Sequence, residues 1–152
     1  MDTDASVMEG NDIQDLGGGS FRTVGAMTGY SALDLYAMGL LGEGDVATFF
    51  YVESPVNVSP SRGRESSPTS NVTMNGTRRD VLIQDIVAAN GPRQPSVAES
   101  PRLLTQAFIY VAGPGRTAAS DQIEKLDRIR RQWEGFFVQA TGGRMRADTT
   151  LR

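Results

Sequence analysis

The sequence predicts an α+β protein with a small, mainly antiparallel sheet, packed by a long C-terminal helix and two shorter helices. Three observations predict it. Apolar residues recur at helical spacing near the C-terminus, several short runs are β-branched and aromatic, and helices and strands do not alternate strictly along the chain. Without strict alternation, parallel βαβ units are not expected and antiparallel pairing is.

The chain has 152 residues, which is a size typical of one domain. We therefore expect residues 1–152 to form a single domain or the C-terminal subdomain of a larger protein. The 15 basic and 18 acidic residues give a net charge of -3, which offers no long-range attraction to nucleic acid or anionic lipid. No apolar run is long enough to span a bilayer, so neither nucleic-acid binding nor membrane insertion is expected.

The first third of the chain begins with residues 1–29, which are rich in Gly, Asp, Ser and Thr and are expected to be a mostly irregular lead-in. A helix is predicted from Ser31 to Leu41, because apolar side chains have helical spacing there and Ser31 can cap its start. Gly42 and Gly44 can end this helix. The aromatic and β-branched run 46–54 predicts a strand that stops at Pro55.

The middle of the chain begins with a segment rich in proline and serine, residues 55–70, which predicts an exposed loop. Next, the pair Asn75-Gly76 tolerates positive φ at both central turn positions. It therefore predicts a type I′ hairpin that pairs residues 72–74 with residues 77–82. A short helix is predicted to follow from Ile83 and to close at Gly91-Pro92.

The last third predicts a strand in the run TQAFIYVAG, residues 105–113, and then the longest helix, Ser120 to Ala140, stopped by glycines. Trp133, Phe136 and Phe137 lie on the apolar stripe of this helix. We expect them to anchor it on the sheet formed by residues 49–52 and 108–111.

Catalytic and metal-binding side chains are scarce, because the chain has no cysteine and no histidine. Histidine is the commonest general base and transition-metal ligand, so neither a hydrolase triad nor a zinc site is expected within the chain. The glycine cluster 17–19 lacks the lysine and hydroxyl of a phosphate loop, which disfavours nucleotide binding. The acidic residues of the lead-in favour a solvated loop, with an irregular calcium site as the alternative. We expect no metal ion and no cofactor in this chain.

The stretch YSALDLYAMGLLG, Tyr30 to Gly42, carries a resemblance to a known group. It is similar to a segment of the form S-x-L-D-L-Y-x-M-G-L in large exported bacterial proteins related to zinc metallopeptidases of the zincin type. The matching residues are Ser31, Leu33, Asp34, Leu35, Tyr36, Met38, Gly39 and Leu40. The run before it and the closing run RIRRQWEGFFVQATGGRMRADTTL also resemble that group, so the resemblance covers most of the chain.

This resemblance implies the C-terminal portion of a zinc-metallopeptidase-like domain. In that group an HExxH helix lies upstream and supplies zinc ligands and the catalytic glutamate, and this chain has no such motif. The chain would then be catalytically incomplete in itself, with zinc in a longer, exported parent. The implied partners are the upstream segment of the parent and a peptide or protein substrate.

The resemblance also singles out three side chains of the stretch. Met38 becomes a candidate for the methionine beneath a zincin metal site, and Asp34 and Tyr36 become candidates for supporting the metal ligands or the oxyanion. The alternative for Met38 is an ordinary core residue. The alternative function for the whole chain is a non-enzymatic binding or scaffold domain, with residues 55–70 as its contact surface.

Overall fold

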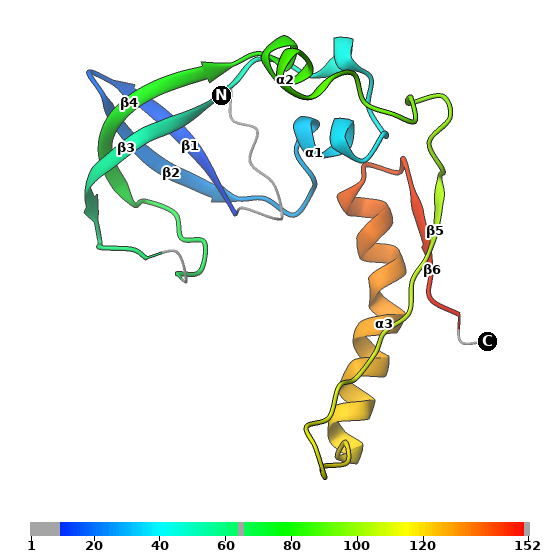
Figure 1. Cartoon of the computed structure of the whole chain (residues 1–152). Coiled ribbons are helices and arrows are strands. Elements are labelled where there is room, and N and C mark those ends of the chain that lie inside the picture. Colours follow the sequence, from blue (N-terminus) through cyan, green and yellow to red (C-terminus); the bar gives the residue numbers. More distant parts are fainter. Residues whose placement is uncertain (1–9, 64–65, 151–152) are drawn as a thin grey trace. The chain divides into compact units, whose positions relative to one another are not determined.

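The computed structural model describes residues 10–63 and 66–150. It confirms the α+β class: a four-stranded antiparallel sheet, a small parallel strand pair and three α-helices, the longest near the C-terminus. Two compact units make up the chain, unit 1 (Met1–Ser100) and unit 2 (Pro101–Arg152). Figure 1 shows the sheet in unit 1 and the long helix in unit 2.

The sheet of unit 1 has the strand order β1-β2-β4-β3, and every neighbouring pair is antiparallel. It curves strongly, as Figure 1 shows. On it, Phe21 and Phe50 are buried, with ring centroids 6.1 Å apart. The strands are β1 (Asn11–Gly17), β2 (Ser20–Ala26), β3 (Phe49–Ser59) and β4 (Thr73–Val81).

Strands β1 and β2 form a hairpin, so the expectation of a mostly irregular lead-in is wrong for residues 11–26; residues 1–9 lie outside the described residues. The glycine cluster makes the turn, since Gly18 and Gly19 have φ of +61° and +77°. The Asp15 carboxylate accepts the Gly17 N–H at 2.8 Å. This bond, with the Arg78 guanidinium, holds the pKa of Asp15 below its ordinary value.

The predicted hairpin at Asn75-Gly76 is also wrong, because both residues lie inside the continuous strand β4. Asn75 is paired on both sides, with Ser20 of β2 and Val56 of β3. A Cβ on Gly76 would lie 2.5 Å from a methyl carbon of Val52. The glycine therefore permits close approach of β3, rather than a turn.

Strand β3 continues past Pro55 to Ser59, contrary to the prediction that it stops there. The β3–β4 register shifts on both sides of Val56, and Ser54 and Asn57 have positive φ. Pro55 thus falls in an irregular part of the ladder, where a missing N–H is tolerated. Within residues 55–70, the described side chains are exposed apart from the half-buried Val58 and Thr69.

Three short helices complete unit 1: α1 (Ala32–Ala37), the 3₁₀ turn η1 (Glu43–Asp45) and α2 (Ile83–Asn90). Helix α1 begins after Ser31 as predicted, but it ends at Ala37 rather than at Leu41. A buried cluster of Tyr36, Val46 and Ile83 joins the three elements. Among the described residues, no helix is both long and apolar enough to cross a membrane.

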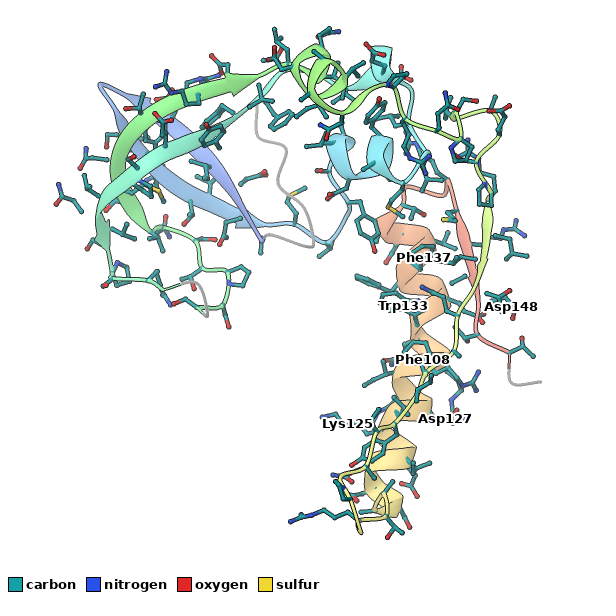
Figure 2. The ribbon with its side chains drawn as sticks, viewed as in Figure 1. Phe108, Lys125, Asp127, Trp133, Phe137 and Asp148 are labelled. Carbon is teal, nitrogen blue, oxygen red and sulfur yellow. The ribbon has the colours of Figure 1, made fainter. Side chains whose placement is uncertain are left out.

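Unit 2 contains helix α3 (Ser120–Ala140), with the predicted bounds, and a parallel pair of short strands, β5 (Leu103–Thr105) and β6 (Arg146–Asp148). The strand predicted over 105–113 is therefore largely wrong, because β5 ends at Thr105. Trp133 is half-buried and contacts Phe108, Phe136 and Phe137, with centroids 6.1, 5.5 and 5.8 Å away (Figure 2). Residues 108–111 lie in no strand, so the prediction that they form one sheet with residues 49–52 is wrong. Anchoring of the aromatic cluster on residues 49–52 stays a prediction.

The chain after β6 is held on α3 by Glu134. Its carboxylate accepts the backbone N–H and the hydroxyl of Thr149, both at 2.8 Å, and Thr149 is 2% exposed. The backbone bond and then the hydroxyl bond lower the pKa of Glu134 from its ordinary value of 4.5. Ionised Glu134 thus stabilises the packing of Thr149 against the helix.

We expect Glu134→Gln to reduce the dependence of stability on pH in the acid range. A lowered pKa contributes stability that is present above pH 4.5 and is lost as the pH falls through the folded-state pKa. The melting temperature of the parent should therefore fall toward that of Glu134→Gln between about pH 6 and about pH 3. Glu124→Gln, at an exposed position of the same helix, is the control. A difference in melting temperature between the parent and Glu134→Gln that does not change with pH would contradict the prediction.

Candidate functional site

The LDLYAMG stretch forms helix α1, and the start of this helix accounts for Asp34. The Ser31 hydroxyl oxygen accepts the Asp34 N–H at 3.0 Å, and the Asp34 carboxylate accepts the Ser31 N–H at 3.3 Å. This reciprocal pair is a capping box, and the carboxylate also complements the positive end of the helix. Burial and then the charge of Asp34 raise the pKa of Tyr30. Asp34 therefore has a structural task at the N-terminus of α1.

The end of α1 accounts for Gly39 and Leu40. Gly39 has a φ of +74° and donates its N–H to the Tyr36 carbonyl at 2.8 Å, and the Leu40 N–H reaches the Leu35 carbonyl at 2.7 Å. These two bonds make a Schellman motif, and Leu35 and Leu40 are both buried. A Cβ on Gly39 would also lie 2.0 Å from the Ser100 hydroxyl oxygen. Glycine is required here by conformation and by space.

Arg93 fastens the segment after α2 to the C-terminal end of α1. Its backbone N–H donates to the Tyr36 hydroxyl at 3.1 Å, and its Nε donates to the Ala37 carbonyl at 2.7 Å. Nη1 donates to the Pro95 carbonyl at 3.0 Å. A guanidinium is favourable at this end of a helix, where the carbonyls carry partial negative charge. Tyr36 and Arg93 are thereby held together.

This pair lines the wall of a cavity of about 350 Å³ between α1 and α2. Leu33, Ile86 and Pro92 give it apolar surface, while Tyr36 and Arg93 bring polar groups. The Tyr36 hydroxyl accepts the Arg93 N–H, and its own O–H has no acceptor among the described residues. A concave, mainly apolar site with few polar groups is typical of a ligand pocket. It is our candidate functional site.

The three side chains that the sequence singled out, Asp34, Tyr36 and Met38, thus have different positions and different roles. Tyr36 lines the cavity, Asp34 caps the helix, and the half-buried Met38 is the residue that follows the helix, where its N–H donates to the Asp34 carbonyl at 2.8 Å. Arg93 was missed by the sequence interpretation. Its signal was a lone arginine in GPRQP, a position between prolines whose contacts no local pattern predicts.

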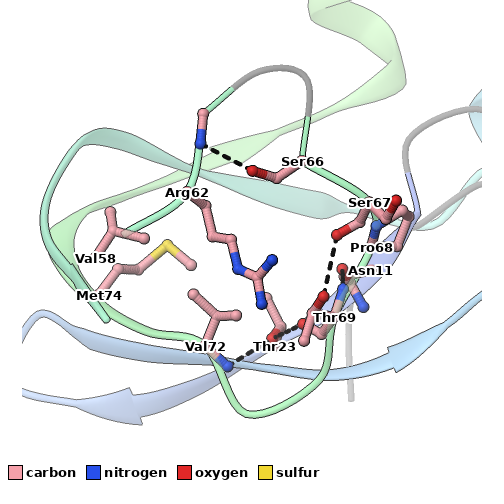
Figure 3. Close-up of a pocket in the computed structure, with 11 residues that line it drawn as sticks. Asn11, Thr23, Val58, Arg62, Ser66, Ser67, Pro68, Thr69, Val72 and Met74 are labelled. Atoms are coloured by element: carbon pink, nitrogen blue, oxygen red, sulfur yellow. Dashed lines mark hydrogen bonds between the residues drawn. The ribbon is translucent and has the colours of Figure 1, made fainter. Parts of the chain in front are cut away.

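A second hollow, of about 180 Å³, lies under the loop between β3 and β4 (Figure 3). Its polar groups fasten the loop: the Thr23 hydroxyl donates to the Thr69 carbonyl at 2.6 Å and accepts the Val72 N–H at 2.9 Å. The Asn11 side chain accepts the Thr69 N–H at 2.8 Å. Arg62 brings a positive charge to this hollow.

In the part of the chain that the structure describes, no group of three or more His, Cys, Asp or Glu side chains is placed to hold a metal ion.

Comparison of the chain with models of protein families, with curated proteins and with solved structures finds no match. The site must therefore be interpreted from its own geometry.

The capping box predicts a graded loss of stability. Ser31→Ala should cost about 1 kcal/mol, as removal of an N-cap side chain does. Asp34→Asn keeps an acceptor oxygen and loses charge at the helix start, so it should cost about 0.3–1 kcal/mol. Chemical denaturation measures both. Asp85→Asn is the matched control, because Asp85 accepts the Leu82 N–H in the same way on α2. A loss above about 3 kcal/mol for Asp34→Asn would indicate a buried charge network instead.

The Schellman motif predicts that Gly39→Ala is harmful. The left-handed backbone alone should cost about 1–2 kcal/mol, and the contact with Ser100 adds to this. The double variant Gly39→Ala, Ser100→Gly should recover the stability lost through the contact with Ser100, but not the stability lost through the left-handed backbone. Gly44→Ala is the control, because its φ is not positive and its Cβ would meet nothing within 4 Å. Equal denaturation midpoints for Gly39→Ala and Gly44→Ala would refute the assignment.

Proposed function

We propose that this chain is the C-terminal portion of a zinc-metallopeptidase-like domain and supplies a peptide-binding wall rather than metal ligands. The observation that supports this most is the Tyr36–Arg93 pair at the 350 Å³ cavity. The residues similar to the metallopeptidase-like group build the helix that carries Tyr36 to that cavity. In this proposal Asp34, Gly39 and Leu40 maintain the helix, and Tyr36 meets the ligand.

The chemistry of the wall follows from its groups. Leu33, Ile86 and Pro92 offer apolar surface to a side chain of a bound peptide. The Tyr36 O–H, oriented by the Arg93 N–H, donates to a peptide carbonyl. Zinc held by an upstream HExxH segment would supply Lewis-acid chemistry for hydrolysis. The residues of this chain bind and orient the substrate.

The proposal is tested first by metal content and then in the longer protein. Carboxylates alone compete poorly for zinc, so the chain dialysed against zinc should retain well under one ion per molecule by elemental analysis. In a parent that contains HExxH, Tyr36→Phe should lower kcat/KM about tenfold or more, as loss of one oriented donor does. The melting temperature should fall by a few degrees at most.

The matched control in the parent is Asp34→Asn, which we expect to leave kcat/KM within about threefold, because Asp34 acts in capping. Chelator-resistant, stoichiometric zinc in the isolated chain would overturn the assignment of the metal ligands to the upstream segment. Unchanged kcat/KM in Tyr36→Phe would overturn the role of Tyr36.

A second candidate function is the non-enzymatic binding or scaffold domain. The observation that favours it is the hollow under the β3–β4 loop, with Arg62 as its charged group. A parent without HExxH and without peptidase activity, whose binding of a partner is lost in Arg62→Ala, would favour this function over the first. Tyr36→Phe would then have no effect on binding.

A further inference from the structure

A second, smaller hollow of about 170 Å³ adjoins the candidate site. Tyr36, Pro92 and Arg93 line both this hollow and the 350 Å³ cavity. The rest of the smaller hollow is lined by residues 41–43, at the start of η1, and by residues 96–97, after α2. The site therefore consists of two neighbouring hollows that share one wall.

The two hollows differ in their charged groups. Apart from the shared Arg93, the residues that line the larger cavity are uncharged, whereas the smaller hollow also has Glu43. Among the described residues, the Glu43 carboxylate makes no hydrogen bond and no ion pair. The Arg93 guanidinium already donates from Nε and Nη1 to the carbonyls of Ala37 and Pro95. Glu43 thus brings a carboxylate whose acceptor capacity is fully open.

The charges beside the smaller hollow favour a cation in it. Asp45 lies two positions after Glu43, in the same turn. The Glu99 carboxylate accepts the backbone N–H and the hydroxyl of Ser96, a lining residue, at 3.3 and 2.9 Å. These three carboxylates outnumber the single guanidinium of Arg93, so a cationic group is attracted more than an anionic one.

The turn that carries Glu43 has a fixed place relative to Tyr36. The Asp45 N–H reaches the Gly42 carbonyl at 3.1 Å, and the Val46 N–H reaches the Glu43 carbonyl at 3.2 Å. Val46 is buried in one cluster with Tyr36, which ties the end of this turn to the shared wall. Both hollows are therefore preorganised with respect to each other.

We propose that the two hollows bind side chains two positions apart in an extended peptide: an apolar side chain in the larger cavity, and a lysine or arginine that pairs with Glu43 in the smaller hollow. In an extended chain, side chains two positions apart point to the same side and are separated by about 7 Å. Adjacent hollows with one shared wall suit that spacing. This inference rests on the proposed function, because it takes the cavity as a peptide site, and it adds which peptides the site prefers.

The test titrates the whole, isotope-labelled chain with short peptides and follows its backbone amides by NMR. Because the direction of the peptide is open, acetyl-Leu-Ala-Lys-amide and acetyl-Lys-Ala-Leu-amide are both used, each beside a version with norleucine in place of lysine. In at least one direction the lysine peptide should bind about three- to fivefold more tightly than its norleucine version, as expected for an exposed ion pair. This preference should disappear at about 1 M salt, which screens such a pair.

Variants of the turn locate the preference. Glu43→Gln should remove it, so that the lysine and norleucine peptides bind about equally, and Glu43→Lys should reverse it in favour of a glutamate peptide. Asp45→Asn is the matched control: it removes the same charge from the same turn but does not line the hollow, so most of the preference should remain. Since Glu43 and Asp45 are exposed, the melting curves of all three variants should match that of the parent.

Three results overturn the inference. One is equal binding of the lysine and norleucine peptides, and another is a preference that Glu43→Gln retains or that Asp45→Asn removes just as completely; in both cases the cavity is still a peptide site. The third is no binding of any of the peptides. The proposed function is decided separately, by kcat/KM of Tyr36→Phe in the longer parent, so the two proposals can fail independently.

Discussion

The two-sided pairing of β4 is the constraint on which the sheet of unit 1 depends. This strand is the last of the four in sequence, yet it lies between β2 and β3 and forms ladders with both. The hairpin β1–β2 and strand β3 are otherwise unconnected by strand pairing within the described residues. Backbone groups on both edges of β4 are used, and Gly76 shows the consequence: its N–H donates to the Gly19 carbonyl at 2.9 Å, while a Cβ there would meet Val52 and Glu53 of β3.

Helix α1 shows how a sequence that resembles a functional motif can be explained by local stability. Six helical residues are too few to be stable by propensity alone. The capping box at Ser31, the Schellman motif at Gly39 and the guanidinium of Arg93 satisfy backbone groups at the two ends. Tyr36 is the polar residue of the stretch that also borders open space, and for this reason the proposed function depends on it rather than on Asp34.

The sequence was informative where a signal is local and misleading where tertiary pairing decides. The apolar stripe of α3 and the cap at Ser31 depend on near neighbours, and both were predicted. The pair Asn75-Gly76 is typical of a turn, but it lies inside β4, where the glycine permits the close approach of β3. Local sequence alone does not distinguish these two uses of a glycine. Gly17–Gly19 were taken as irregular, because the alternation of Phe21 and Thr23 is hidden among small polar residues. The bond from Arg93 to Tyr36 spans 57 positions, and no local pattern contains it.

The three donors of Arg93 also affect how unit 1 opens. Its backbone N–H and Nε donate to Tyr36 and Ala37, so the end of α1 and the segment after α2 do not separate without breaking these two bonds, while the bond from Nη1 to Pro95 lies within the segment. The two segments therefore behave as one cooperative unit in local unfolding. A ligand that binds the cavity and restrains one of these segments therefore also reduces the conformational entropy of the other. The rigidity of the pocket wall depends on both segments together.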